Sequence, residues 1–442
     1  MAPDPRIMKA VEQLGYRVTV GDVAARAGLN INLAEQGLLT LASDAGGHLQ
    51  VAESGEIAYL FPKNFRTHLR NKFLRLRLQE WWEKIWRVLF YLIRISFGIL
   101  LIASIVLIFV AIAIILVAIN SSNDSNDSGG GDSHHSGGGG GFVFMPHFWY
   151  WSDIWWWFDP GYDPYYRQRR ESSRSSRSEM NFLEAIFSFL FGDGNPNADL
   201  EERRWQTIGT VIRNARGAVA AEQIAPYLDD IPQGYKRDYE DYMLPVLTRF
   251  NGRPEVSPDG EIVYHFPDLQ TTASSWQLQP VSAFLQELRW RFSRASSGQI
   301  LLATGLGGVN IIGALVLGSL LRGGQVAAQL GGLVAFVQSI YWLLLVYGIA
   351  FLTIPLIRYF WIQWKNSQVE ARNQKRQVQA IAIERADATI QKKIAYARQF
   401  AAQNTIGNED LVYTSETDLL DQEIEQKDKI DAEWQRRLES GS

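Results

Sequence analysis

The stretch HLQVAESGEIAYLFP, residues 48–62, has the pattern of a strand, a tight turn and a second strand. Gly55 permits the positive φ of a tight hairpin turn, and the apolar alternation after it gives a strand with one apolar face. The stretch RPEVSPDGEIVYHFP, residues 253–267, repeats this pattern at one constant offset. The matching residues are Val51, Gly55, Glu56, Ile57, Tyr59, Phe61 and Pro62 in the first copy and Val256, Gly260, Glu261, Ile262, Tyr264, Phe266 and Pro267 in the second. We therefore expect the chain to use one hairpin twice.

Helical patterns precede each hairpin. The first copy has an apolar stripe (Ile7, Met8, Val11 and Leu14), a capping box (Thr19 and Asp22), a helix-ending glycine (Gly28) and a second N-cap (Asn30). The second copy offers helices over 205–217, 218–229 and 234–252, in which Pro226 and Pro245 reduce the regularity. Helix, helix, turn, helix and hairpin is the order of a winged helix. We predict winged-helix-like modules over 1–65 and 198–270.

The charges of these modules argue against a nucleic acid partner. Phosphate binding requires clustered Lys and Arg. The expected third helix of the first module, residues 31–44, contains neither, and the acidic residues on it and on its hairpin are Glu35, Asp44, Glu53 and Glu56. In the second module Lys236, Arg237 and Arg249 are offset by Asp238, Glu240 and Asp241. Protein–protein contact suits such surfaces better than DNA binding does.

Three apolar segments predict transmembrane helices, over 88–119, 300–321 and 330–357. About twenty helical residues span a bilayer core of roughly 30 Å. The short connection RGGQVAAQ predicts that the second and third spans form an antiparallel hairpin. The fold class is therefore a membrane protein, mainly α, with two small α+β modules, about three transmembrane helices and a C-terminal helical arm.

Small and polar residues within the spans indicate helix–helix packing. The pairs Ala303/Gly307 and Ala314/Gly318 allow another helix to approach closely. Asn310 and Gln338 are polar at membrane depth. Hydrogen bonding between helices is the favoured role for both, and a transport site is the alternative.

Basic, Trp-bearing flanks indicate the orientation. Residues 66–87 form a basic pre-membrane helix with Trp81, Trp82 and Trp86, and ELRWRFSR precedes the second span. We expect each hairpin to be followed by such a helix. By the positive-inside rule, the N-terminal module and the C-terminal arm lie on the cytoplasmic or stromal side.

The region between the first span and the second module is harder to interpret. Residues 120–141 are a Gly/Ser-rich linker. Within 142–192, residues 142–166 are aromatic and form either a short or re-entrant crossing or an interfacial belt. Residues 181–191 form a short amphipathic helix, which we expect to lie in the bilayer interface.

Residues 358–442 form a cytoplasmic helical arm. Ile390, Ile394, Ala397 and Ala401 fall at helical spacing, with Lys392, Lys393 and Arg398 at other positions. The arm packs on the modules, self-associates or remains a solvated tail. A second short helix is expected over 415–438.

The composition excludes several chemistries. The 442-residue chain has no cysteine, so it has no disulfide, thiolate nucleophile or Cys-ligated metal. The histidines His48, His68, His134, His135, His147 and His265 show no metal-ligand spacing. A weak metal site of His134, His135 and Asp132 is the alternative interpretation. A flexible polar linker is the favoured interpretation of this segment. The GLGG at 305–308 indicates packing, and Glu201/Glu202 and Asp229/Asp230 indicate solvated helix and turn residues. We predict no catalytic, cofactor-binding or metal-binding residue, no cofactor and no enzyme activity.

The stretches VTVGDVAARAGL, IAYLFP and FLFGDGNPNADLEERRWQTIG resemble a family of uncharacterised membrane proteins from cyanobacteria and plant chloroplasts. Some plant members are labelled iron–sulfur cluster biosynthesis proteins, although this chain has no Cys to ligate a cluster. The resemblance implies a thylakoid or plasma membrane of a photosynthetic organism.

We therefore expect an integral membrane scaffold or assembly factor. Its partners would be membrane lipids and a protein of a membrane complex or a second copy of the chain. The alternatives are a channel or transporter subunit and a membrane-tethered DNA-binding regulator.

Overall fold

The computed structural model describes residues 3–72, 74–124, 180–229, 231, 240–275, 277–322, 329–385 and 388–418, with separate positions between 420 and 438. The described chain is mainly helical with small sheets. It divides into two compact units. Unit 1 comprises Met1–Lys84, Asn195–Arg289 and Lys365–Ser442, and unit 2 comprises Ile85–Gly194 and Trp290–Trp364. The predicted linker beyond Asp124 and the aromatic segment 142–166 lie outside the described residues.

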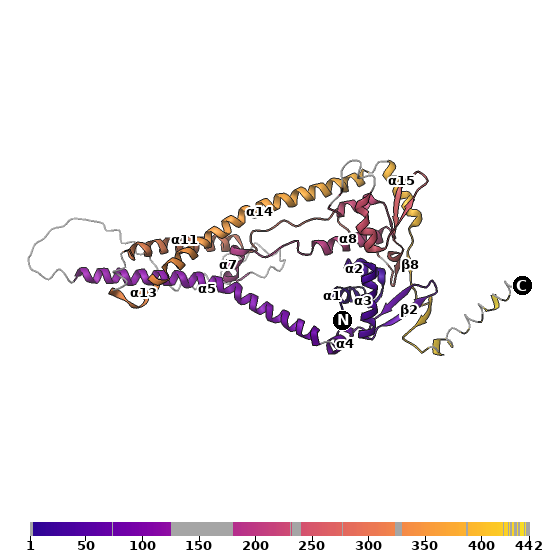
Figure 1. Cartoon of the computed structure of the whole chain (residues 1–442), viewed down its shortest axis with the longest axis horizontal. Coiled ribbons are helices and arrows are strands. Elements are labelled where there is room, and N and C mark those ends of the chain that lie inside the picture. Colours follow the sequence, from indigo (N-terminus) through magenta and orange to yellow (C-terminus); the bar gives the residue numbers. More distant parts are fainter. Residues whose placement is uncertain are drawn as a thin grey trace, which may run out of the picture. The chain divides into compact units, whose positions relative to one another are not determined.

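The first copy in unit 1, called module 1, follows the order helix, strand, helix, helix, hairpin (Figure 1). Its elements are α1 (Pro5–Gln13), β1 (Arg17–Thr19), α2 (Val20–Ala27), α3 (Ile31–Ala45), β2 (His48–Ala52) and β3 (Ile57–Leu60). The Thr19/Asp22 capping box opens α2, Gly28 ends it at φ 64°, and Asn30 caps α3, so these predictions are confirmed. Strand β1 was not predicted.

The second copy, module 2, follows the same order. Its elements are α8 (Leu200–Asn214), β4 (Ala218–Val219), α9 (Ala221–Ile224), η1 (Ala225–Tyr227), η3 (Asp241–Met243), α10 (Leu244–Phe250), β5 (Arg253–Val256) and β6 (Ile262–His265). The helix predicted over 218–229 begins as a strand and tightens into a 3₁₀ turn at Pro226, because proline lacks the N–H of a helix interior. Part of the helix predicted over 234–252 lies outside the described residues.

The two hairpins share one backbone. Gly55 and Gly260 both have φ 82°. The Ala52 N–H donates to the Glu56 carbonyl at 2.9 Å, and the Ser257 N–H donates to the Glu261 carbonyl at 2.8 Å. Strand β1 pairs with β3 in the register in which β4 pairs with β6. The duplication inferred from sequence therefore extends to hydrogen bonds and register.

Both modules contribute to one apolar core. It joins residues such as Val23 and Leu38 of module 1 to Ile208 and Phe250 of module 2. Helices α2 and α8 pack closely. A Cβ added at Gly209 would lie only 2.8 Å from the Ala25 Cα, so the glycine leaves room for this approach. The modules are therefore halves of one folded body.

The C-terminal arm contributes strands as well as helices. Its elements are the end of α14 (Tyr341–Glu384), α15 (Ala388–Ala397), η5 (Arg398–Phe400), β8 (Asn404–Thr405) and β9 (Leu411–Thr414). Strand β8 pairs in parallel with β7 (Thr271–Thr272), and β9 extends module 1 to the sheet order β1-β3-β2-β9. The purely helical prediction was wrong here, and the arm packs on the modules. Described positions between 420 and 438 are helical.

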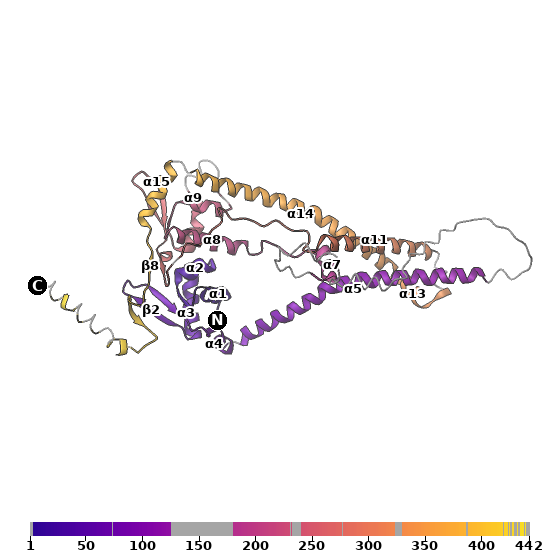
Figure 2. The same ribbon diagram turned by 180° about the vertical axis from the view of Figure 1, so that it is seen from behind.

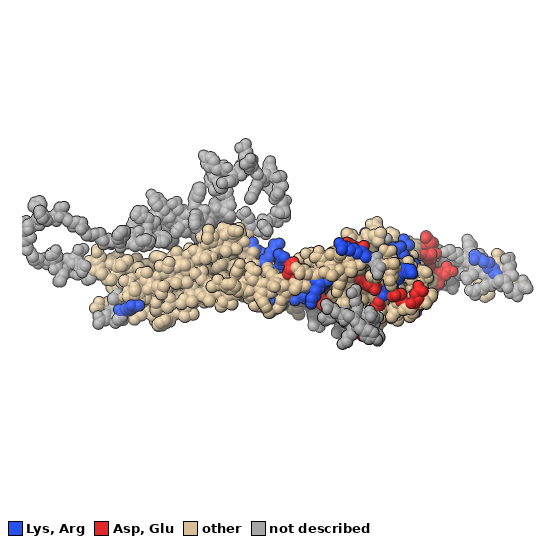
Figure 3. Space-filling model, turned by 90° about the horizontal axis from the view of Figure 1, so that it is seen from above, with Lys and Arg blue, Asp and Glu red and all other residues tan. Residues whose placement is uncertain are grey.

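Unit 2 holds the apolar helices. Within the described chain, three helical segments are long and apolar enough to cross a membrane: Lys84–Ser121 of α5 (Leu74–Asp124), α11 (Ser297–Leu320) and α14. On the face that Figure 3 shows, the described surface of unit 2 is almost entirely uncharged. The predicted pre-membrane helix consists of α4 (Phe65–Lys72) and the start of α5.

Helices α11 and α14 run antiparallel, as predicted, and lie side by side in both views (Figures 1 and 2). A Cβ at Gly307 would lie 2.6 Å from the Phe351 ring, and one at Gly318 would lie 2.1 Å from the Tyr341 hydroxyl. The single span predicted over 330–357 is instead two helices, α13 (Gly332–Ser339) and α14, with Ile340 between them.

One further expectation was wrong. The segment between Thr272 and α11, in its described part, is not helical, so a pre-membrane helix follows only the first hairpin. Helix α7 (Phe182–Phe191) buries Ile186, Phe189 and Leu190 against the other helices of unit 2. It therefore belongs to the core of that unit, and its expected position in the bilayer interface stays a prediction.

Candidate functional site: a groove between the modules

The described residues contain no group of three or more His, Asp or Glu side chains that could hold a metal ion. The Nδ1 atom of His48 lies 3.1 Å from the Ser415 carbonyl, and Nε2 of His265 lies 3.1 Å from the Gln270 amide oxygen. His68 belongs to α4. His134, His135, His147 and Asp132 lie outside the described residues, as does Asp230.

The predicted solvated acids have structural partners. Arg204 pairs with Glu201 at 2.7 Å and with Asp229, which also pairs with Arg376 of the arm. Asp229 thus links module 2 to the arm.

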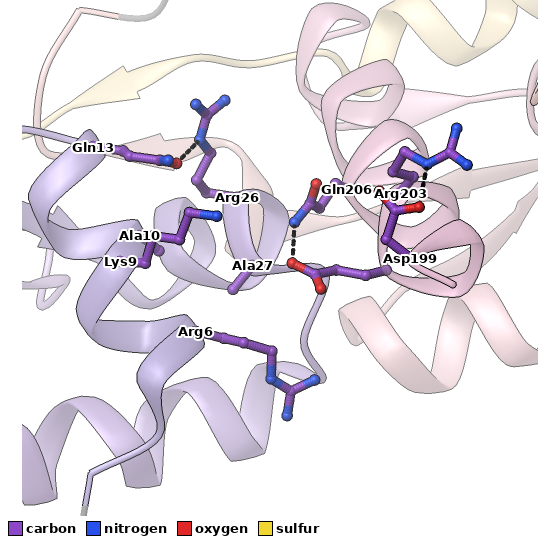
Figure 4. A pocket seen from close by; sticks show the side chains of 10 residues that line it. Arg6, Lys9, Ala10, Gln13, Arg26, Ala27, Asp199, Arg203 and Gln206 are labelled. Carbon is purple, nitrogen blue, oxygen red and sulfur yellow. Dashed lines mark hydrogen bonds and ion pairs between the residues drawn. The ribbon is translucent and has the colours of Figure 1, made fainter. Parts of the chain in front are cut away.

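A groove lies where α1 and α2 of module 1 face α8 of module 2 (Figure 4). Its cavity volume is about 360 Å³. Ala10 and Ala27 supply apolar surface. The polar side chains that line it are Arg6, Lys9, Gln13, Arg26, Asp199, Glu202, Arg203 and Gln206. The groove exists only because the two copies pack against each other.

The pairing of these side chains is uneven. Arg203 pairs with Asp199 at 3.1 Å, and the Gln206 amide donates to Glu202 at 2.9 Å. Arg6 pairs with Asp4 at 2.9 Å, a hydrogen bond that raises the pKa of the Arg6 guanidinium. On the α8 side, Asp199 is therefore paired with a cation, whereas Glu202 is held by a neutral amide.

Lys9 and Arg26, on the α1–α2 side, are not balanced by acids. The Arg26 Nε donates to the Gln13 amide oxygen at 2.8 Å, a neutral partner. Within the described chain, neither cation has a carboxylate within ion-pair distance. Two positive charges thus face the groove without compensation.

The cations of module 1 converge on this groove. From residue 3 to the end of β3, the lysines and arginines are Arg6, Lys9, Arg17 and Arg26. Arg17 is engaged inside the fold, where it donates to the carbonyls of Ala273 and Ile406 at 2.7 Å each. The other three line the groove. Sequence reasoning did not single them out, and only the three-residue spacing of Arg6 and Lys9 on one helix hinted at a shared face.

Helix α3 and its hairpin present a different surface. The exposed face of α3 carries Leu33, Glu35 and Leu39, and the hairpin turn exposes Glu53.

In module 2, Arg249 of α10 stacks over the Trp205 ring at 4.0 Å and donates to the Gly28 carbonyl at 2.6 Å. The cation of α10 therefore holds the modules together.

Unit 2 contains a polar cluster around Asp193. Arg94 pairs with Asp193 at 3.1 Å, and the Ser188 hydroxyl donates to it at 2.7 Å. The Ser188 and Ser293 hydroxyls lie 2.7 Å apart, and Arg358 donates to the Phe189 carbonyl at 2.7 Å. These contacts bring together four parts of unit 2: the beginning of the apolar part of α5, the end of α7, the segment before α11 and residue 358 of α14.

Asn310 joins two apolar helices. Its side chain is fully buried, and its amide donates to the Ser104 hydroxyl of α5 at 2.5 Å. The favoured prediction of a hydrogen bond between helices is thus supported for Asn310. Gln338 lies exposed on α13, so the same prediction was wrong for that residue.

A comparison with curated proteins found a relative described as "Uncharacterized protein At5g03900, chloroplastic" from Arabidopsis thaliana. It is 40% identical over 446 residues, which covers 98% of this chain and 82% of the relative. No family model matches the chain, and no solved structure does. The description of the relative supports a chloroplast family and contains no iron–sulfur label.

Proposed function

The chain belongs to the family of this chloroplastic Arabidopsis protein, and from that premise we propose a non-enzymatic membrane scaffold or assembly factor that docks partner proteins. The proposed setting is a photosynthetic membrane, such as the thylakoid. One observation carries the proposal: two copies of a module and a C-terminal arm fold into one body that is tethered to apolar helices.

We assign the modules to the winged-helix type. The order helix, strand, helix, helix, two strands supports this, as does the pairing of β1 with β3 and of β3 with β2. The lack of Lys and Arg on α3 favours protein contact over DNA, because phosphate neutralisation supplies most non-specific DNA affinity.

The proposed orientation places all of unit 1 on the cytoplasmic or stromal side. The polar cluster around Asp193 lies at one end of the apolar parts of α5, α11 and α14. Among the described residues of unit 2, the lysines and arginines at this end are Arg87, Arg94, Arg291, Arg294 and Arg358, whereas Arg322 follows the opposite end of α11. This asymmetry follows the positive-inside rule.

Protease protection tests the orientation. Tags placed at the N-terminus and after Gly194 should be digested together in sealed membranes, and a tag after Ser121 should be protected. Protection of the tag after Gly194, with digestion of the N-terminal tag, would contradict the proposed orientation.

Partner capture tests the docking role. Leu33 on α3 is 58% exposed and Leu278 is 77% exposed, so either leucine tolerates a charge without loss of core packing. Affinity purification in mild detergent should recover a stoichiometric membrane protein with wild type and with Leu278→Glu, and less with Leu33→Glu. Recovery of the chain alone at every expression level would contradict the scaffold role.

A further inference from the structure

We propose that the groove between α1, α2 and α8 binds a small polyanion, a molecule that carries at least two carboxylate or phosphate groups. This site is independent of the docking role. Its primary recognition groups are Lys9 and Arg26, with Arg6 beside them.

The distribution of charge supports this assignment. Elsewhere, the exposed surface of module 1 carries acids such as Glu35 and Glu53, while its exposed cations up to the end of β3 line one groove. Scattered lysines and arginines keep a protein soluble, whereas cations gathered in a concave site focus the potential and raise the local concentration of anions.

The pairing pattern sets the ligand charge. On the α8 side, Arg203 compensates the charge of Asp199, and Glu202 accepts a hydrogen bond from the neutral Gln206 amide. Lys9 and Arg26 remain without a carboxylate in the described chain. One anionic group facing each of these two cations would compensate it, so a ligand with two such groups suits the α1–α2 side of the groove, while the Glu202 carboxylate disfavours binding against α8.

The size and position of the groove set the ligand class. A volume of about 360 Å³ lies at the small end of the range for small-molecule sites, which begins at about 300 Å³. Because the walls come from both modules, a bound anion would contact both and stabilise their packing.

Titration calorimetry on the full-length protein in detergent tests the proposal, with pyrophosphate and citrate as probes at constant ionic strength. Wild type should bind one equivalent of at least one probe. Loss of a charge-assisted hydrogen bond should raise the Kd at least about tenfold in Lys9→Glu and in Arg26→Gln.

Lys63→Glu is the matched control. Lys63 is an exposed lysine of unit 1 that does not line the groove, and its reversal changes the net charge by the same amount as Lys9→Glu. It should keep the wild-type Kd. An equal loss in both variants would show general charge attraction and overturn the site, as would an absence of binding to wild type. Circular dichroism of each variant verifies that the fold is retained.

Discussion

Modules 1 and 2 share a backbone and hold the C-terminal arm in different ways. Module 1 binds the arm through main-chain pairing of β9 with β2. Module 2 and the segment after it bind the arm through a short main-chain pairing of β7 with β8 and, in addition, through buried ion pairs, in which Lys393 contacts Glu222 and Glu240 and Arg376 contacts Asp229 and Glu287. Duplication therefore preserved the fold, and the contacts at its edges diverged.

The edge strands show how this divergence works. The outer side of β2 faces β9, and there the Leu49 N–H donates to the Ser415 hydroxyl at 2.9 Å. Pro254 occupies the equivalent position on β5. Proline has no N–H, so the edge of module 2 cannot offer that donor, and proline is a common means of blocking an edge strand.

The largest expected effect is a loss of unfolding free energy when Asp22, the capping-box residue of module 1, is replaced. Asp22 accepts hydrogen bonds from the Thr19 and Ala273 amides and pairs with the buried Arg213 at 2.5 Å. Asp22→Ala would leave that guanidinium without its charge partner, which should cost about 3–5 kcal/mol of unfolding free energy. Hydrogen exchange of α8 peptides measures the loss.

The equivalent residue of module 2 is the control for that prediction. Gln223 accepts one hydrogen bond from the Ala220 amide at 3.0 Å. Gln223→Ala should cost about 1 kcal/mol, the value of a lost cap. Equal losses in the two variants would mean that Asp22 acts only as a cap.

An intermediate effect concerns the ion pairs beside module 2. Burial alone would raise the pKa of Glu287, but hydrogen bonds and charge from Arg372 and Arg376 outweigh burial and lower it. The stabilisation is therefore complete above the ordinary value of 4.5 and is lost as pH falls through the lowered folded-state pKa. Glu287→Gln should cost about 2 kcal/mol near neutral pH, the value of hydrogen bonds to a charged group.

Thermal melts across the acid range test this prediction. The stability of wild type should decline more steeply than that of Glu287→Gln as the pH falls below 4.5. Parallel curves would show that Glu287 does not link protonation to folding.

The smallest effect concerns the strand edge. Leu49→Pro removes the donor to Ser415 and should cost about 1 kcal/mol, so the amides of β9 should exchange about five times faster. Leu49→Ala removes the side-chain packing while keeping the N–H, and it separates the two contributions. Unchanged protection of β9 in Leu49→Pro relative to Leu49→Ala would show that the edge hydrogen bond does not hold the arm.

Local signals in the sequence predicted local structure well. Gly55 and Gly260 marked the hairpins, and Thr19 with Asp22 marked the start of α2. These features depend on residues within a few positions of one another, so they can be recognised from a short stretch of sequence.

Long-range features could not be predicted in this way. Strands β1, β4 and β8 have two or three residues, too few for a periodic pattern. The Asp22–Arg213 pair joins residues from different modules, and nothing near either residue marks the other. The groove combines Lys9 and Arg26 with α8, and it appears only after both copies have packed. Lys393 lies off the apolar positions of the arm, and nothing near it in the sequence marks its burial against Glu222 and Glu240.

The late position of β8 and β9 in the chain has a consequence for biosynthesis. Arg17 donates to the Ile406 carbonyl, and β2 gains its outer neighbour only from Leu411–Thr414. The N-terminal module therefore leaves the ribosome long before its last strand does, and all three apolar helices are made in the interval. Nascent chains must keep the outer edge of β2 without this neighbour until Leu411–Thr414 has been translated, and a chaperone that shields exposed strands would act in that period.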